Sequence, residues 1–197
     1  GASARMNTKV VTLAFIALCV AGCASLPPPN CVAFSRGQFC LLPPAMLPAL
    51  DGVRMVTIEH DGKKQMFIGQ LHIDAQAIRL AGSSLFGPSL FTVSYDGHAL
   101  KSEPAGGPQR ADLLIAMLEL VMADQRDLQT AMQDLTLTQT VAANGMRVRE
   151  LFQRDRLVAH IEISAGPLTQ ASIRFNIPPA HVSVWMQPLA NQTSLQP

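Results

Sequence analysis

Residues 53–74 read VRMVTIEHDGKKQMFIGQLHID, two short alternating runs on either side of Asp61-Gly62-Lys63. Alternation of apolar and polar residues is typical of a half-buried β-strand. An Asp-Gly pair between two such runs is a strong signal for a β-hairpin. We therefore expect antiparallel strands at 53–60 and 64–74.

The same alternation continues along the chain. Strands at 77–83 and 89–95 complete a four-stranded meander that ends at Asp96-Gly97. After Asn144-Gly145 four more runs alternate, namely 146–154, 157–164, 169–177 and 182–187.

A helical segment separates the two groups of strands. It opens at Pro108, where the missing N–H of proline costs nothing, and it continues to Ala123. Apolar residues cover more than half of its circumference, so we expect this helix to be packed inside the domain. A second short helix is expected at about 127–134. The fold class is therefore mainly β with inserted helices (α+β): an antiparallel curved sheet or open half-barrel of about eight or more strands that encloses helices.

A lipoprotein signal precedes the domain. Arg5 and Lys9 give a positive start, residues 10–21 are almost wholly apolar, and the segment 18–23 ends in small residues before Cys23. The apolar run is too short to span a bilayer. We expect 1–22 to be a signal peptide and Cys23 to be lipidated; the alternative is an ordinary secretory signal that is cut elsewhere.

Cleavage before Cys23 would leave 197 − 22 = 175 residues, enough for a single domain. Loss of Arg5 and Lys9 lowers the basic count from 15 to 13, against 14 acidic residues, so nucleic acid is not expected as a partner. Acyl chains on Cys23 would hold the protein to a bilayer. Ala24 after the cysteine, by similarity to other bacterial lipoproteins, indicates the periplasmic face of the outer membrane.

Cys31 and Cys40 are predicted to form a disulfide, since an oxidising periplasm favours one. A metal pair or a redox pair would instead be expected to show a Cys-x-x-Cys spacing or a nearby histidine. Prolines are dense between residues 27 and 48. We therefore expect residues 23–50 to be a lipidated, semi-rigid tether, 51–187 to be the folded domain and 188–197 to be a disordered tail.

Enzymatic chemistry is not expected. Gly82-Ser83-Ser84 precedes Asp96 and His98, but a nucleophile elbow needs a Gly-x-Ser-x-Gly turn in a parallel sheet. His72 and Asp74 could begin a metal site, yet no third ligand has a fitting spacing. We predict no catalytic residue, no cofactor and no metal.

Several motifs carry a resemblance to a known family. They are Ile78-Arg79-Leu80-Ala81-Gly82-Ser83-Ser84-Leu85-Phe86-Gly87, the strand end Tyr95-Asp96-Gly97 and the leucine-rich helix that follows. With the signal and the proline-rich stretch, residues 50–187 resemble the LolB-type outer-membrane lipoprotein receptors. They resemble more closely a family of small lipoproteins, often encoded beside aryl-polyene pigment and lipid-export genes, that is thought to share the LolA/LolB-like fold.

This resemblance implies a half-barrel closed by helices, with an apolar cavity for the acyl chains of a lipid or lipoprotein cargo. It also implies that Leu85 and Phe86 form a membrane-insertion loop, although they could instead fold back and plug the barrel. Methionines suit an adaptable lining; the alternative, which composition alone favours, is that they simply fill the core. The candidates for the lining are Met66, Leu80, Phe91, Met117, Leu118, Val121 and Phe175.

The expected function follows from these features. The protein would bind acyl chains at the outer membrane and assist their transfer or insertion, with a periplasmic LolA-like carrier or an exporter as a possible partner. An accessory or docking subunit of an envelope lipid or aryl-polyene export system, without a ligand, is the alternative.

Overall fold

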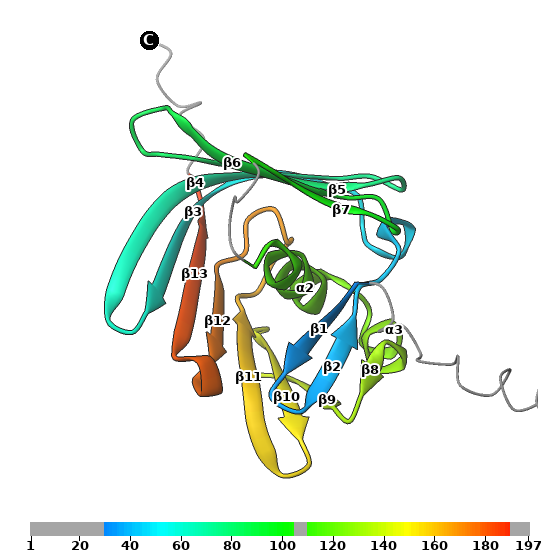
Figure 1. Ribbon diagram of the computed structural model, residues 1–197. Helices are drawn as coiled ribbons and strands as arrows, with labels where there is room; N and C mark the ends of the chain where they lie inside the picture. The colour runs from blue at the N-terminus through cyan, green and yellow to red at the C-terminus, as the bar shows by residue number, and fades with distance from the viewer. Residues whose placement is uncertain (1–29, 105–109, 190–197) are drawn as a thin grey trace, which may run out of the picture.

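The computed structural model describes residues 30–104 and 110–189, and its main element is a ten-stranded antiparallel sheet (Figure 1). The strand order is β7-β6-β5-β4-β3-β13-β12-β11-β10-β9. The strands are β3 (Leu50–His60), β4 (Lys63–Ile73), β5 (Ile78–Ser83), β6 (Ser89–Tyr95), β7 (Leu100–Glu103), β9 (Thr136–Val141), β10 (Arg147–Gln153), β11 (Arg156–Ile163), β12 (Ile173–Ile177) and β13 (Val182–Pro188). Within these residues the edge strands β7 and β9 do not pair with each other, so the sheet stays open.

Two meanders make up the sheet, β3 to β7 and β9 to β13, and they join where β13 pairs with β3. The hairpin of β3 and β4 turns at Asp61 and Gly62, which have φ values of 50° and 75°. A tight hairpin turn needs positive φ at both central residues, which Asp and Gly tolerate. The predicted β-dominated antiparallel fold is confirmed, and an open half-barrel is consistent with this sheet.

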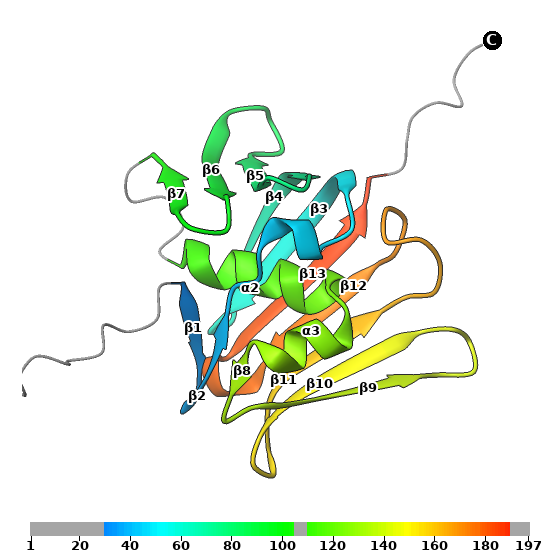
Figure 2. The same ribbon diagram turned by 90° about the vertical axis from the view of Figure 1, so that its right-hand side faces the viewer.

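Two helices lie against one face of the sheet (Figure 2). Helix α2 (Ala111–Met122) crosses that face and is buried along most of its length. Helix α3 (Gln125–Thr130) starts at Asp124, whose carboxylate accepts a hydrogen bond from the N–H of Arg126. This second helix is shorter and earlier than the predicted 127–134, because residues from 132 onward extend as strands. No helix in the described part of the chain is long and apolar enough to cross a bilayer.

The segment before β3 belongs to the folded domain. Strands β1 (Cys31–Phe34), β2 (Gly37–Cys40) and β8 (Met132–Gln133) form a small sheet, and a 3₁₀ turn, η1 (Pro44–Met46), follows β2. Its apolar side chains are buried in the core, namely Val32, Phe34, Phe39, Leu41, Leu42 and Leu47. From residue 31 onward the chain therefore differs from the expected tether, because its alternating apolar residues pack against α2.

Other boundaries also differ from the expectation. Strands β7 and β9 were not predicted, and the strand expected at 169–177 begins at Ile173 because a turn held by Gln170 N–H and the Pro167 carbonyl precedes it. Cys31 and Cys40 are paired residues of β1 and β2 and form a disulfide. Cys23, the predicted signal peptide and residues 190–197 of the predicted tail lie outside the described residues.

Candidate functional site

The C-terminal end of α2 is held by a buried arginine from β10. The Arg149 guanidinium donates to the carbonyl oxygens of Leu120 (2.7 Å), Val121 (3.2 Å) and Ala123 (2.9 Å), and its Nε donates to Gln139 (2.7 Å). The last carbonyls of a helix have no partner within the helix and carry a partial negative charge. Arg149 supplies both the missing donors and the opposite charge.

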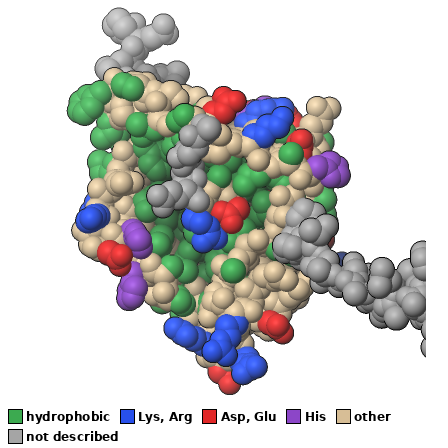
Figure 3. Space-filling view, viewed as in Figure 1, with side chains coloured by type: hydrophobic (Ala, Val, Ile, Leu, Met, Phe, Trp, Pro, Cys, Tyr) green, Lys and Arg blue, Asp and Glu red, His purple; other side chains and the backbone are tan. Residues whose placement is uncertain are grey.

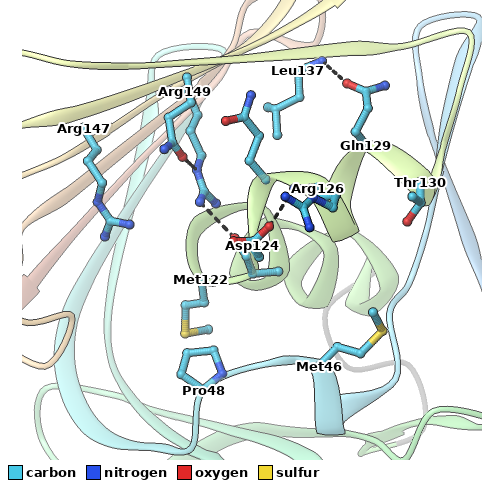
Figure 4. A pocket seen from close by; sticks show the side chains of 13 residues that line it. Met46, Pro48, Met122, Asp124, Arg126, Gln129, Thr130, Leu137, Arg147 and Arg149 are labelled. Carbon is cyan, nitrogen blue, oxygen red and sulfur yellow. Dashed lines mark hydrogen bonds between the residues drawn. The ribbon is translucent and has the colours of Figure 1, made fainter.

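A large open hollow lies beside this arginine, between the α2–α3 junction and strands β9 and β10. We call it the arginine groove; its volume is about 980 Å³. It is lined by Met46, Pro48, Met122, Ala123, Asp124, Gln125, Arg126, Gln129, Thr130, Leu137, Gln139, Arg147 and Arg149. Figure 4 shows Arg149 reaching from the sheet toward the helix junction at Asp124 and Arg126, with Arg147 extending beside it and Met122 and Pro48 below.

The groove is electropositive. Three arginines face one carboxylate, Asp124, which gives a net charge of +2. The pKa of Arg149 is lowered to about 10, mainly by burial and also by the nearby Arg147, while Asp124 opposes the shift. Within the described residues, the side chains of Arg126 and Arg147 make no hydrogen bond or ion pair. Two guanidinium groups in this groove are therefore available to a ligand.

The interior under α2 is nearly filled. It holds a cavity of about 20 Å³, which is room for about one water molecule. The lining residues are Leu50, Arg54, Leu71, Leu118, Val121, Met122, Leu168, Ile173 and Met186. Met122 lines both this cavity and the arginine groove, so the two regions meet at this side chain.

The predicted lining residues fall into different places. Leu118 and Val121 line the interior cavity, whereas Leu80, Met117 and Phe175 are buried in the core without lining it. Phe91 is partly buried and packs edge-to-face against Phe67, over Gly82. Met66 is 50% exposed, because the inward residues of β4 begin at Phe67 and strand side chains alternate between faces. Met66 therefore does not line the interior.

Glu119 places a carboxyl group of α2 in the buried core, facing the segment that follows β2. Its Oε2 accepts a hydrogen bond from the N–H of Leu42 (2.8 Å), and its Oε1 has no partner within the described residues. Burial raises its pKa from 4.5 to about 8, and the Leu42 hydrogen bond only partly opposes the shift. The neutral acid therefore ties α2 to the segment that follows β2.

Leu85 and Phe86 lie at the surface, in the connection between β5 and β6. Their side chains are 40% and 95% exposed. The connection is closed by hydrogen bonds from Ser84 N–H to the Pro88 carbonyl and from Gly87 N–H to the Ser84 carbonyl. Figure 3 shows hydrophobic side chains at the surface at the corresponding end of the sheet, upper left. The two residues do not plug the interior.

Polar clusters occupy the outer face of the sheet. His72 lies between Asp51 and Asp74, whose hydrogen bonds raise its pKa, and His160 lies between Glu150 and Glu162. No group of three or more His, Cys, Asp or Glu side chains suited to a metal ion occurs in the part of the chain that the structure describes.

The comparison with known families covers most of the described domain. The family model described as a protein of unknown function, DUF3261, matches residues 53–189. The chain belongs to the DUF3261 family. The match runs from within β3 to the end of β13 and includes Arg126, Arg147 and Arg149, while β1, β2 and η1 precede it. No curated protein matches the chain.

Sequence reasoning missed the arginine groove. Arg147 and Arg149 stand two positions apart in an alternating strand, which places both on one face together with the buried Leu151. Two arginines on the inward face of a strand were the available signal. No such signal exists for Arg126, because the position of its side chain depends on where α3 begins.

Proposed function

We propose that the protein is a lipid-anchored protein of the outer membrane that binds the acyl chain of a lipid or lipoprotein cargo and assists its transfer. The observation that carries this proposal is the junction at Met122. A mostly apolar interior covered by one helix and an open groove meet at this residue. Such a junction suits a ligand with an apolar chain and a polar end.

Cargo binding would require the interior to open. A cavity of about 20 Å³ cannot hold an acyl chain, so Met122, Leu118 or the whole of α2 would have to shift. The hydrogen bond from Leu42 to Glu119 holds α2 in place. The Oε1 of Glu119, unpaired within the described residues, nevertheless lowers the cost of such a shift, because a buried polar atom without a partner makes the closed state less stable. In this proposal α2 fills the interior until cargo displaces it.

The exposed loop supports a membrane-facing role. Exposed apolar residues gathered at one place often mark a contact surface. Phe86 and Leu85 stand in a loop with a defined turn, and Cys23 would tether the domain close to a bilayer. We propose that this loop touches the membrane when cargo leaves.

Lipid extraction of the full chain, purified from a bacterial envelope, tests the proposal. Extracts are compared for the wild type, Leu118→Ala and Leu113→Ala; Leu113 is also partly buried on α2 but does not line the cavity. Truncation of Leu118 enlarges the cavity, so this variant should carry more non-covalent acyl lipid than the wild type, and Leu113→Ala should not. Protein without any non-covalent lipid in all three samples would contradict the proposal.

The filled interior favours a second candidate, a docking subunit of an envelope exporter that binds no ligand. In that case Leu85 and Phe86 would contact a protein partner instead of lipid. The same extraction separates the two, since a docking subunit should yield only its own covalently attached acyl chains.

A further inference from the structure

We propose that the arginine groove binds the anionic headgroup of the cargo, with Arg126 and Arg147 as its ligands and the chain passing Met122 into the interior. This inference rests on the proposed function and narrows the cargo to an anionic amphiphile: one acidic group, carboxylate or phosphate, attached to an apolar chain.

The charges of the groove support the choice of an anion. Arg147 lies close enough to Arg149 to affect its protonation, and only Asp124 offsets the three positive charges. Asp124 is itself engaged with the N–H of Arg126 at the start of α3. Two guanidinium groups that lack a protein anion in the described residues would gain an ion pair from a bound acid. The planar guanidinium suits the paired oxygens of carboxylates and phosphates.

The roles of the three arginines differ. Arg149 is buried and spends its donors on α2 and Gln139, so it contributes charge and fixes the wall of the groove. Arg126 is exposed and Arg147 is half-buried, and both line the hollow without a partner. These two can turn toward a ligand without breaking any hydrogen bond or ion pair within the described fold.

The apolar residues of the groove indicate an amphiphile instead of a simple anion. Met46, Pro48, Met122 and Leu137 line the same hollow as the arginines. Met122 also lines the interior cavity, together with Val121 and Leu118 of the same helix. A chain attached to an acid held by Arg126 and Arg147 would therefore have an apolar path toward the core.

Calorimetry on the full chain in neutral phosphatidylcholine nanodiscs tests the inference, with the signal from empty nanodiscs subtracted. The probes are octyl phosphate, octanoate, octyl glucoside and inorganic phosphate. The wild type should bind octyl phosphate and octanoate more tightly than octyl glucoside, and should bind inorganic phosphate weakly. Octyl phosphate should bind about tenfold more weakly to the double variant Arg126→Gln/Arg147→Gln, since each charge-assisted hydrogen bond contributes strongly. Binding of octyl glucoside should be unchanged.

Arg154→Gln is the matched control, because Arg154 is an exposed arginine just beyond the other end of β10. It should bind all four probes like the wild type. Equal affinity of the wild type for octyl phosphate and octyl glucoside would overturn the inference while leaving acyl binding intact, as would an unaffected double variant. Inorganic phosphate bound as tightly as octyl phosphate would show a plain anion site and also overturn it. Binding of none of the amphiphiles would contradict the proposed function itself.

Discussion

The interior under α2 and the arginine groove share Met122 but differ in every other respect. The interior is nearly full: its cavity of about 20 Å³ is lined by apolar side chains and the buried Arg54, and Glu119 is buried as a neutral acid on the same helix. The groove is open, about 980 Å³ in volume and carries a net charge of +2. The open groove could accept the polar end of a ligand as it stands, whereas an acyl chain could enter the interior only by displacing protein side chains. The energetic cost of binding would therefore come mainly from rearranging the interior.

The largest effect on the free energy of unfolding is expected at Arg149, which joins the groove to the end of α2. Arg149→Met leaves three carbonyls at the end of α2 without their donor, so it should lower the free energy of unfolding by about 4 kcal/mol. Arg147→Met, on the same face of β10, should change it by less than about 0.5 kcal/mol. Urea unfolding of both variants measures the difference. Equal losses of unfolding free energy would contradict the view that Arg149 supports the fold whereas Arg147 is free to bind a ligand.

Glu119 gives a smaller, pH-dependent effect. Its pKa of about 8 in the folded state exceeds its ordinary value of 4.5, so the folded protein keeps a proton that the unfolded chain loses. This contribution to stability is complete below about pH 4.5 and is lost as the pH rises to 8. Relative to Glu119→Gln, the wild type should lose about 3 kcal/mol between pH 5 and pH 8. Urea unfolding at several pH values measures it; parallel pH profiles for the two proteins would contradict the buried neutral acid.

The sequence predicted what local pattern controls. The hairpin at Asp61-Gly62, the meander to Tyr95 and the apolar helix were all readable, because alternation and turn chemistry act over a few residues. The folded segment from residue 31 was mistaken for a tether, since proline density outweighed the short alternation around Phe34 and Phe39. The joining of β13 to β3, and with it the shape of the interior, depends on contacts more than 100 residues apart.

The candidate site was less predictable than the fold. Leu118 and Val121 were named as candidates for the lining, and the structure places both beside the small interior cavity. The groove was missed because it forms only when α3, β9 and β10 come together in space. Met66 was named because it is a methionine. Strand side chains alternate between the two faces of the sheet, and Met66 lies on the face opposite the buried Phe67.

The smallest effect on stability is expected at the exposed loop. Leu85→Glu combined with Phe86→Ser should leave the melting temperature nearly unchanged, because neither side chain contributes to the core. Transfer of bound lipid to liposomes should be abolished. Val141→Ser, which removes an exposed apolar residue from the opposite edge of the sheet, is the control and should transfer normally. A large drop in melting temperature of the loop variant would show that the loop supports the fold instead.

Photo-crosslinking tests most directly whether one ligand occupies both regions. A fatty acid with a diazirine at the end of its chain is irradiated with the full chain, and the modified peptides are identified by mass spectrometry. The account predicts labels on residues around the interior cavity, such as Leu118, Val121 and Met186, and loss of these labels in Arg126→Gln/Arg147→Gln. Labels confined to Leu85 and Phe86, with an unmodified interior, would contradict the account.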